Sequence, residues 1–245
     1  MAKILLEIGS LQSCNLNVFR IVETQEIAAT TGLVDDLEEQ HLLEQLLDKV
    51  KPSYREGTEK LHYLISTPFR YPPLKYGSRF GDITMPSYFY ASECIETALA
   101  ECAFYRLVFL HDMSVPFERP IKSGHMTFSV KIQSNAVADL TLVKSKDIAT
   151  LLKSPNDYIL TQQLGKVLIQ EKGTKVIKFF SARDKLGINY AIAVPETIKS
   201  ARPENSVNWI CHSTLNKISF ITKGGRPISF SIDNFNVDGV LPRFA

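Results

Sequence analysis

Residues 87–110 read SYFYASECIETALAECAFYRLVFL, and the pattern of apolar side chains changes within this stretch. Its opening, SYFYAS, is mostly aromatic, a composition typical of a β-strand. Beyond Ser92, whose hydroxyl is suited to cap a helix, apolar residues such as Ala98, Cys102 and Tyr105 recur at spacings of three and four. The stretch therefore predicts a strand followed directly by a helix that ends near residue 110, a combination expected of an α+β fold.

The rest of the chain continues this mixture of helices and strands. Residues 35–50 and 156–173 carry apolar residues at helical spacing. Short apolar or alternating runs predict strands at residues 61–66, 126–132, 176–180, 188–194, 207–211, 217–222 and 227–232. No repeat or low-complexity linker divides the chain. The sequence thus predicts a single α+β domain, in which residues 1–60 are an N-terminal helical extension packed on a core domain of residues 61–245.

The composition limits the classes of partner. The 245 residues are 44% apolar, and 28 Lys and Arg against 26 Asp and Glu give a net charge of +2. This charge is too small for a field that would attract nucleic acid, so direct nucleic-acid binding is not expected. No apolar run approaches the roughly 18 to 20 residues that a membrane-spanning helix needs. Four scattered cysteines without a CxxC pair, and no signal-like N-terminus, predict a reduced, cytoplasmic protein.

Most sequence motifs with a known chemistry are missing. The chain has no GxGxxG, GxxxxGK[ST], HExxH or GxSxG motif, and its five histidines lack ligand spacing, so no metal site is expected. Cys211 and His212 are neighbours in a predicted strand, where they point to opposite faces and are poorly placed as a thiolate and its base. The KGGRP turn at residues 223–227 can offer backbone N–H groups to phosphate, but such turns more often connect two strands.

Four segments remain, and together they resemble a known family. They are FRI around Arg20, TPFRYPPLKYGSRFG at residues 67–81, YFYASECIETALAE at residues 88–101 and VIKFFSARDKLGINYAIAVP at residues 176–195. They resemble the RES family, NAD-degrading toxins of Xre-RES type toxin–antitoxin systems with a fold similar to ADP-ribosyltransferase toxins. The resemblance covers about residues 17–198, and it identifies residues 61–245 as the RES domain. The preceding helical extension is similar to that of the longer branch of the family.

The resemblance also implies which residues form the site. The Arg, Glu and Ser of the family match Arg79 in GSRF, Glu101 at the end of TALAE and Ser181 in FFSARD. Two supporting positions match Arg20 in FRI and Tyr90 in FYAS. Arg79, Glu101 and Ser181 are therefore expected to be catalytic, and Arg20, Tyr90, Arg79 and Ser181 are expected to bind NAD.

Each assignment suits the side chain concerned. The planar guanidinium of Arg79 can donate paired hydrogen bonds to a pyrophosphate, whereas a surface arginine is the ordinary alternative. Glu101 lies at the edge of a mostly apolar helix face, where a carboxylate needs a partner. The hydroxyl of Ser181, at the end of an apolar strand, can bind the nicotinamide amide or the ribose, although it can equally cap a turn. Tyr90 can stack on nicotinamide or belong to the core, and Arg20 can bind a phosphate.

The implied activity is cleavage of the bond between nicotinamide and ribose in NAD, by hydrolysis or by phosphorolysis. NAD is then a substrate, no cofactor is required, and inorganic phosphate is a possible second substrate. Two alternatives stay open: a mono-ADP-ribosyltransferase that modifies a protein, and a catalytically silent binding module. The family also implies an antitoxin with a helix-turn-helix domain as partner. The sequence does not decide which acceptor is used, whether the protein forms a homodimer, or what the residues after 200 do.

Overall fold

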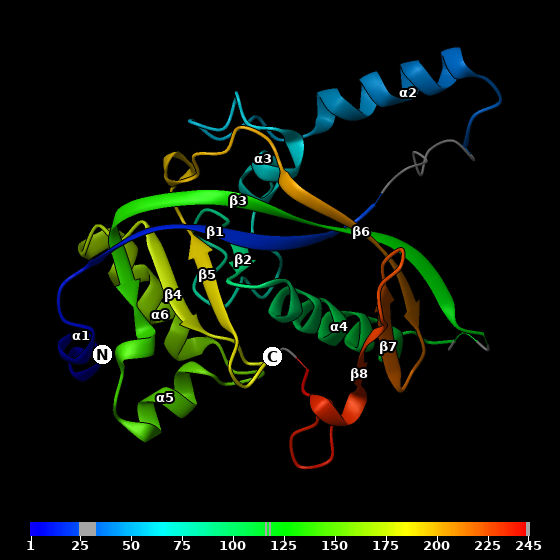
Figure 1. Ribbon diagram of the computed structural model, residues 1–245. Helices are drawn as coiled ribbons and strands as arrows, with labels where there is room; N and C mark the ends of the chain where they lie inside the picture. Colours follow the sequence, from blue (N-terminus) through cyan, green and yellow to red (C-terminus); the bar gives the residue numbers. More distant parts are fainter. Residues whose placement is uncertain (25–32, 116, 118, 244–245) are drawn as a thin grey trace.

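The computed structural model describes residues 1–24, 33–115, 117 and 119–243, and its longest strand, β3 (Ile121–Asp139), connects the parts of the fold (Figure 1). β3 pairs with β1 (Gln12–Glu23) along most of the length of β1, with β6 (Glu204–Ser213) near its start and with β4 (Val176–Phe180) at its end. The remaining strands are β2 (Phe89–Ser92), β5 (Ile188–Ile192), β7 (Lys217–Ile221) and β8 (Ile228–Ser231). In the described residues the strand order is β1-β2-β5-β4-β3-β6-β7-β8.

An additional pairing between β1 and β3 closes five of these strands into a ring. Every second residue of a strand faces the same side, so each strand sends one set of apolar side chains into the ring. Val18, Phe89, Phe128 and Tyr190 belong to this interior core. The helix α3 (Tyr63–Arg70) packs against the same core.

The other side of the strands is covered by helices. Figure 1 shows α4 (Ile95–His111), α5 (Lys146–Leu152) and α6 (Ile159–Lys166) below the crossing strands β1 and β3. The short helix α1 (Ala2–Ile8) joins the core of α5 and α6. α4 is buried on several sides and packs with the strands β6 and β7. This arrangement confirms the predicted α+β fold in a single domain.

Two local predictions were wrong. Residues 61–66 were expected to be a strand, but Tyr63–Arg70 form helix α3. The imidazole of His62 accepts the N–H of Leu64 at the helix start, and Ile65 and Phe69, four residues apart, share the buried face. Such short apolar runs fit either periodicity, so their spacing does not distinguish a strand from a helix.

The second error concerns the cap of α4. Ser92 was expected to cap this helix, but the residue before its first turn is Cys94, which makes no side-chain cap. Ser92 lies in β2, where its Oγ donates to Oδ1 of Asn189 at 2.7 Å. A hydroxyl two residues before the N-cap lies outside the reach of the first-turn N–H groups.

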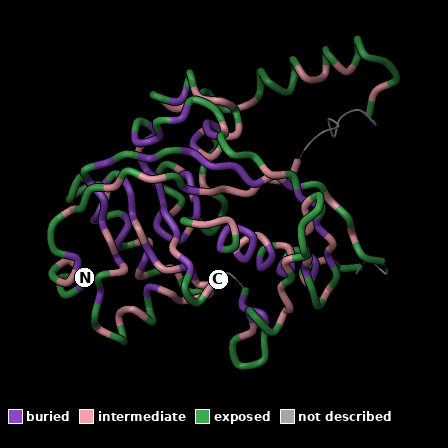
Figure 2. Tube along the Cα trace, viewed as in Figure 1, coloured by how far each residue is buried: buried purple, intermediate pink, exposed green. Residues whose placement is uncertain are grey.

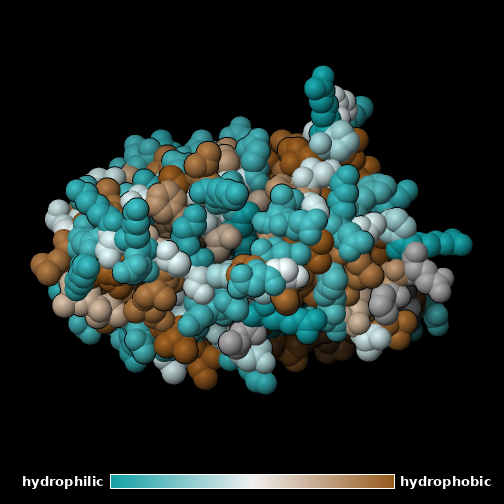
Figure 3. Space-filling view, turned by 90° about the horizontal axis from the view of Figure 1, so that it is seen from below, coloured by the Kyte–Doolittle hydropathy of each residue, from teal (hydrophilic) through white to brown (hydrophobic). Residues whose placement is uncertain are grey.

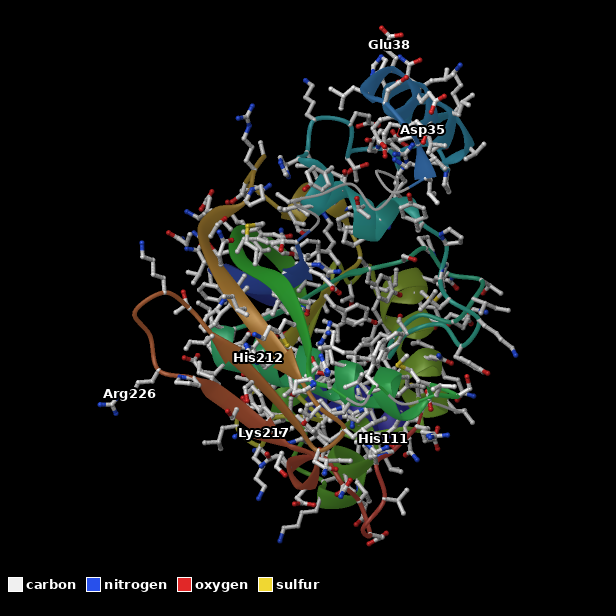
Figure 4. The ribbon with its side chains drawn as sticks, turned by 90° about the vertical axis from the view of Figure 1, so that its right-hand side faces the viewer. Asp35, Glu38, His111, His212, Lys217 and Arg226 are labelled. Carbon is white, nitrogen blue, oxygen red and sulfur yellow. The ribbon has the colours of Figure 1, made fainter. Side chains whose placement is uncertain are left out.

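The predicted helix of the extension forms but does not pack as expected. In α2 (Leu37–Val50), the side chain of Asp36 accepts the N–H groups of Glu38 and Glu39, but the helix buries no residue. It projects from the rest of the molecule (Figures 1 and 2), and Figure 4 shows Glu38 far from the sheet. β1, in contrast, is part of the ring. The described part of residues 1–60 thus includes both a strand of the ring, β1, and the exposed helix α2, and the division of the chain at residue 60 stays a prediction.

The outer surface mixes polar and apolar areas. The face seen in Figure 3 is largely hydrophilic with separate apolar patches. In the turn between β7 and β8, Arg226 is exposed and points away from the sheet (Figure 4). No helix in the described ranges has both the length and the apolar character needed to cross a membrane.

Candidate active site

The carboxylate of Glu101 on α4 binds a hydroxyl that follows β4. Oγ of Ser181 donates to Oε1 of Glu101 at 2.6 Å. The same Oγ accepts the backbone N–H groups of Arg183 and Asp184, each at 3.0 Å. A serine hydroxyl has a single hydrogen and two lone pairs, so these two N–H groups leave its hydrogen for the carboxylate. The turn after β4 thus fixes the direction in which Ser181 donates.

A second donor reaches the same carboxylate oxygen from β5. Nδ2 of Asn189 donates to Oε1 of Glu101 at 2.7 Å. Oδ1 of Asn189 accepts the hydroxyl of Ser92, so the amide is bound at both ends. Within the described residues no donor is bound to Oε2. Among the described residues, the carboxylate is therefore held through Oε1.

Arg79 lies in the Gly-bounded loop of the sequence motif and holds a neighbouring loop. Its Nη1 donates to the carbonyl of Leu152 at 3.1 Å, and its Nη2 donates to the carbonyl of Ser154 at 3.0 Å. The guanidinium carbon lies 4.5 Å from the ring centroid of Tyr158. Only 8% of Arg79 is exposed. The fork of Arg79 is thus directed at the loop between α5 and α6.

Tyr90 fixes the loop that carries Arg79. Its hydroxyl accepts the N–H of Phe80 at 3.2 Å and donates to Oγ of Ser78 at 2.9 Å. Burial raises the pKa of Tyr90 to about 12, so the phenol keeps its proton at neutral pH. The hydroxyl expected to contact NAD is thus bound to the loop of residues 77–81.

A glycine lets α6 approach the same loop. A Cβ atom on Gly165 would overlap the carbonyl oxygen of Phe80, so no larger residue fits without moving the backbone. One turn earlier, Nε2 of Gln162 donates to the carbonyls of Tyr76 and Ser78. The position of Arg79 therefore depends on direct backbone packing against α6.

Arg183 is a second buried arginine near Glu101, and it was not among the predicted site residues. Its guanidinium carbon lies 3.3 Å from the ring centroid of Phe104 on α4, and its Nη2 donates to the carbonyl of Pro155. Like Arg79, it is 8% exposed. The carbonyls of the loop between α5 and α6 thus bind two guanidinium groups.

The charges of the group act on one another. The pKa of Arg183 is lowered mainly by burial, while Tyr158, Glu101 and Tyr105 raise it and Arg79 lowers it. Charges shift a pKa in this way only from nearby. The five side chains therefore lie near one another, and Glu101 and Tyr158 among them are partly exposed.

A protein-family model, described as the RES domain, matches residues 53–212 of the chain. The chain belongs to the RES-domain family. The matched range includes Arg79, Glu101 and Ser181, and it begins after Arg20. No curated protein sequence matches the chain significantly. Among solved structures, this RES-domain protein is similar to one described as the M. tuberculosis MbcT-MbcA toxin-antitoxin complex, with 10% identity and a TM-score of 0.47 over 85% of this chain and 92% of that chain.

The RES domain does not bring Arg20 into this group. Nη1 of Arg20 donates to the carbonyl of Tyr90 at 2.7 Å, and its guanidinium lies 5.1 Å from the ring centroid of Phe89. Phe89 belongs to the ring interior and stacks on Phe69 of α3. Burial lowers the pKa of Arg20 to about 10, and its buried Nε has no hydrogen-bond partner among the described residues.

Two residues of the site had weak signals in the sequence. Asn189 is a polar residue inside the apolar run INYAIAV, and a buried amide needs partners. Arg183 follows Ser181 within the same quoted segment. Neither signal gives the identity of the partner, because Glu101 lies far away in the sequence.

Proposed function

We propose that this RES-domain protein binds NAD and cleaves the bond between nicotinamide and ribose, as the toxin of a toxin–antitoxin pair. The observation that carries the proposal is the carboxylate of Glu101, bound by Ser181 and Asn189 beside the guanidinium groups of Arg79 and Arg183. NAD has one charge that must be stabilised during cleavage and two phosphates that must be held. The site offers one anion and two cations for these tasks.

Glu101 is the group proposed to stabilise the transition state. Cleavage leaves positive charge on the ribose C1 and its ring oxygen, as in glycoside hydrolysis. The electron pair of the broken bond goes to the nicotinamide nitrogen, which is positively charged in NAD, so the leaving group needs no general acid. Two donors on Oε1 fix the direction of the carboxylate before the charge develops. Oε2 is then available to the cationic sugar or to the attacking nucleophile.

Arg79 and Arg183 are proposed to hold the pyrophosphate. Planar guanidinium groups bind phosphate oxygens through paired, charge-assisted hydrogen bonds. In the structure both donate to carbonyls of the loop between α5 and α6. When NAD binds, phosphate oxygens would replace these carbonyls as acceptors or share the arginine N–H donors with them. Arg20 is left out of this assignment because its contacts lie with Phe89 and the carbonyl of Tyr90.

Replacement of Glu101 tests the proposal directly. Glu101→Gln keeps the shape of the side chain but removes the charge, and we expect the rate of NAD loss to fall by about 10²-fold or more. Glu96→Gln on the exposed side of the same helix is the matched control and should keep the parental rate. The measurement is NAD consumption by the purified proteins, with circular dichroism to verify folding. A folded Glu101→Gln protein that consumes NAD at the parental rate would contradict the proposal.

The products identify the acceptor. With water the sugar carbon gains a hydroxyl and the products are ADP-ribose, nicotinamide and a proton; with inorganic phosphate they are a phosphorylated ADP-ribose and nicotinamide. Labelled NAD incubated with and without phosphate separates these reactions. A labelled protein band would instead support a mono-ADP-ribosyltransferase, and unchanged NAD would support a silent binding module.

The toxin role implies a restraining partner. Members of the RES family are paired with antitoxins, and we propose a cytoplasmic partner with a helix-turn-helix domain that blocks the site. Expression of the parent should lower cellular NAD and stop growth, and expression of Glu101→Gln should do neither. Growth of cells that express the parent alone, with NAD unchanged, would contradict the toxin role.

A further inference from the structure

We infer that Asn189 is the positioning residue of Glu101, and that its amide, anchored at Oδ1 by Ser92, keeps the carboxylate in the direction that cleavage of NAD requires. The inference rests on the proposed function, to which it adds a residue that acts through Glu101 and not on NAD itself.

The strands place Asn189 on the side of α4. In β5 the alternate residues Ile188, Tyr190 and Ile192 pack toward the ring interior. Asn189 therefore points to the opposite face, where α4 lies. In the register of the sheet it is paired with Ser92 of β2. Asn189 is 6% exposed, so its polar atoms must find partners within the protein.

Both ends of the amide have a partner, and the two partners are not interchangeable. Oδ1 of Asn189 accepts the hydroxyl of Ser92 at 2.7 Å, and Nδ2 donates to Oε1 of Glu101 at 2.7 Å. A flipped amide would turn its oxygen toward the carboxylate and set two acceptors against each other. The carboxylate, which can only accept, therefore selects the orientation in which the amide donates to it, and Ser92, which is 4% exposed, holds the other end of the amide by donating to Oδ1.

Ser181 cannot replace this function alone. It donates to the same oxygen, Oε1, from the turn after β4. One donor leaves the carboxylate group free to rotate about that bond, whereas two donors, one from the turn after β4 and one from β5, fix its plane. Loss of the Asn189 donor should therefore misdirect Oε2 while the protein and the phosphate-binding arginines stay in place.

Kinetics of isosteric variants provide the first test. Asn189→Asp keeps the bond from Ser92 but places an acceptor against Oε1, and we expect kcat to fall by about 10²-fold. KM for NAD should change less than about threefold, since Arg79 and Arg183 are untouched. Ser92→Ala removes only the hydroxyl that anchors Oδ1 of Asn189 and should lower kcat less than Asn189→Asp does. Asn208→Asp, an exposed Asn to Asp change in β6, is the matched control and should leave kcat unchanged. A parental kcat in Asn189→Asp would overturn the inference.

A stability cycle provides a second test that needs no catalysis. Glu101→Gln removes the negative charge that would face the carboxylate introduced by Asn189→Asp, so that change should destabilise the protein less in the Glu101→Gln background than in the parent. The measurement is the urea midpoint of the parent, both single variants and the double variant. Equal shifts in both backgrounds would overturn the inference. If the parent left NAD intact, the proposed function would fail, and this cycle alone would decide whether Asn189 positions Glu101.

Discussion

The helices α4 and α2 both contain leucines at helical spacing, but they use them in opposite ways. In α4, Leu99 and Leu107 are 0% exposed, and the helix lies between the sheet and the C-terminal residues around Phe235. In α2, Leu42 is 56% exposed and Leu46 is 49% exposed. The helical spacing of leucines thus predicts a helix in both cases, but it does not predict that the chain supplies a surface to cover it. The helix with neighbours on several sides is the one that carries Glu101.

Truncation of one leucine in each helix should give the largest difference. Leu107→Ala in α4 opens a cavity in a packed core and should lower the free energy of unfolding by about 2 to 5 kcal/mol. Leu46→Ala in α2 removes an exposed side chain and should change it by less than about 0.5 kcal/mol. Urea unfolding of the two variants and the parent measures both values. A similar loss in both variants would show that α2 is covered in solution, for example by a second copy.

The fold could be predicted from the sequence where the pattern was long or bounded by clear turns. The helix of α4 and the strands β4 and β5 around the turn SARDKLG were predicted and are confirmed. The segment of α3 was not, because its short apolar run fits a strand as well as a helix. The closure of the ring by β1 and β3 could not be predicted either, since pairing between strands so far apart in the sequence leaves no local signal.

The site was predictable only in part, and for a different reason. Arg79, Glu101 and Ser181 came from the resemblance to the RES family, and spacing alone gives no reason to join Glu101 with Ser181. The structure brings these two into contact, with Arg79 beside them. Asn189 required knowledge of the register between β2 and β5, because its function depends on Ser92 lying opposite. Arg20 matched a short motif, and the structure places it elsewhere.

Arg79 and Arg70 both donate to backbone carbonyls, but in different regions of the molecule. Arg79 binds the carbonyls of Leu152 and Ser154 at the loop between α5 and α6, whereas Arg70 binds the carbonyl of Pro52 and the carboxylate of Asp48 at the end of α2. Lysine keeps the charge but cannot form the paired bonds. Arg79→Lys should raise KM for NAD by about tenfold, a loss of about 1.4 kcal/mol.

Arg70→Lys is the matched control for this change. It alters the same kind of carbonyl contact in the region of α2, so we expect KM for NAD to stay at the parental value. Steady-state kinetics of both variants provide the measurement. An increase of KM in Arg70→Lys equal to that in Arg79→Lys would mean that the region of α2 contributes to NAD binding.

The smallest expected effect is a dependence of stability on pH that originates beneath α4. His125 of β3 is 2% exposed, its ring lies edge-on to Phe220, and its pKa is lowered from 6.5 by burial and by the nearby charge of Arg106 on α4. A lowered pKa in the folded state means that the unfolded chain binds the proton first as the pH falls below 6.5. The free energy of unfolding should therefore be highest above that pH and decline below it.

Urea unfolding at about pH 7.5 and about pH 5.5 measures this decline. The decline should be reduced in His125→Gln and unchanged in Leu46→Ala, because α2 is remote from this core. An equal decline in His125→Gln and the parent would show that other groups cause it.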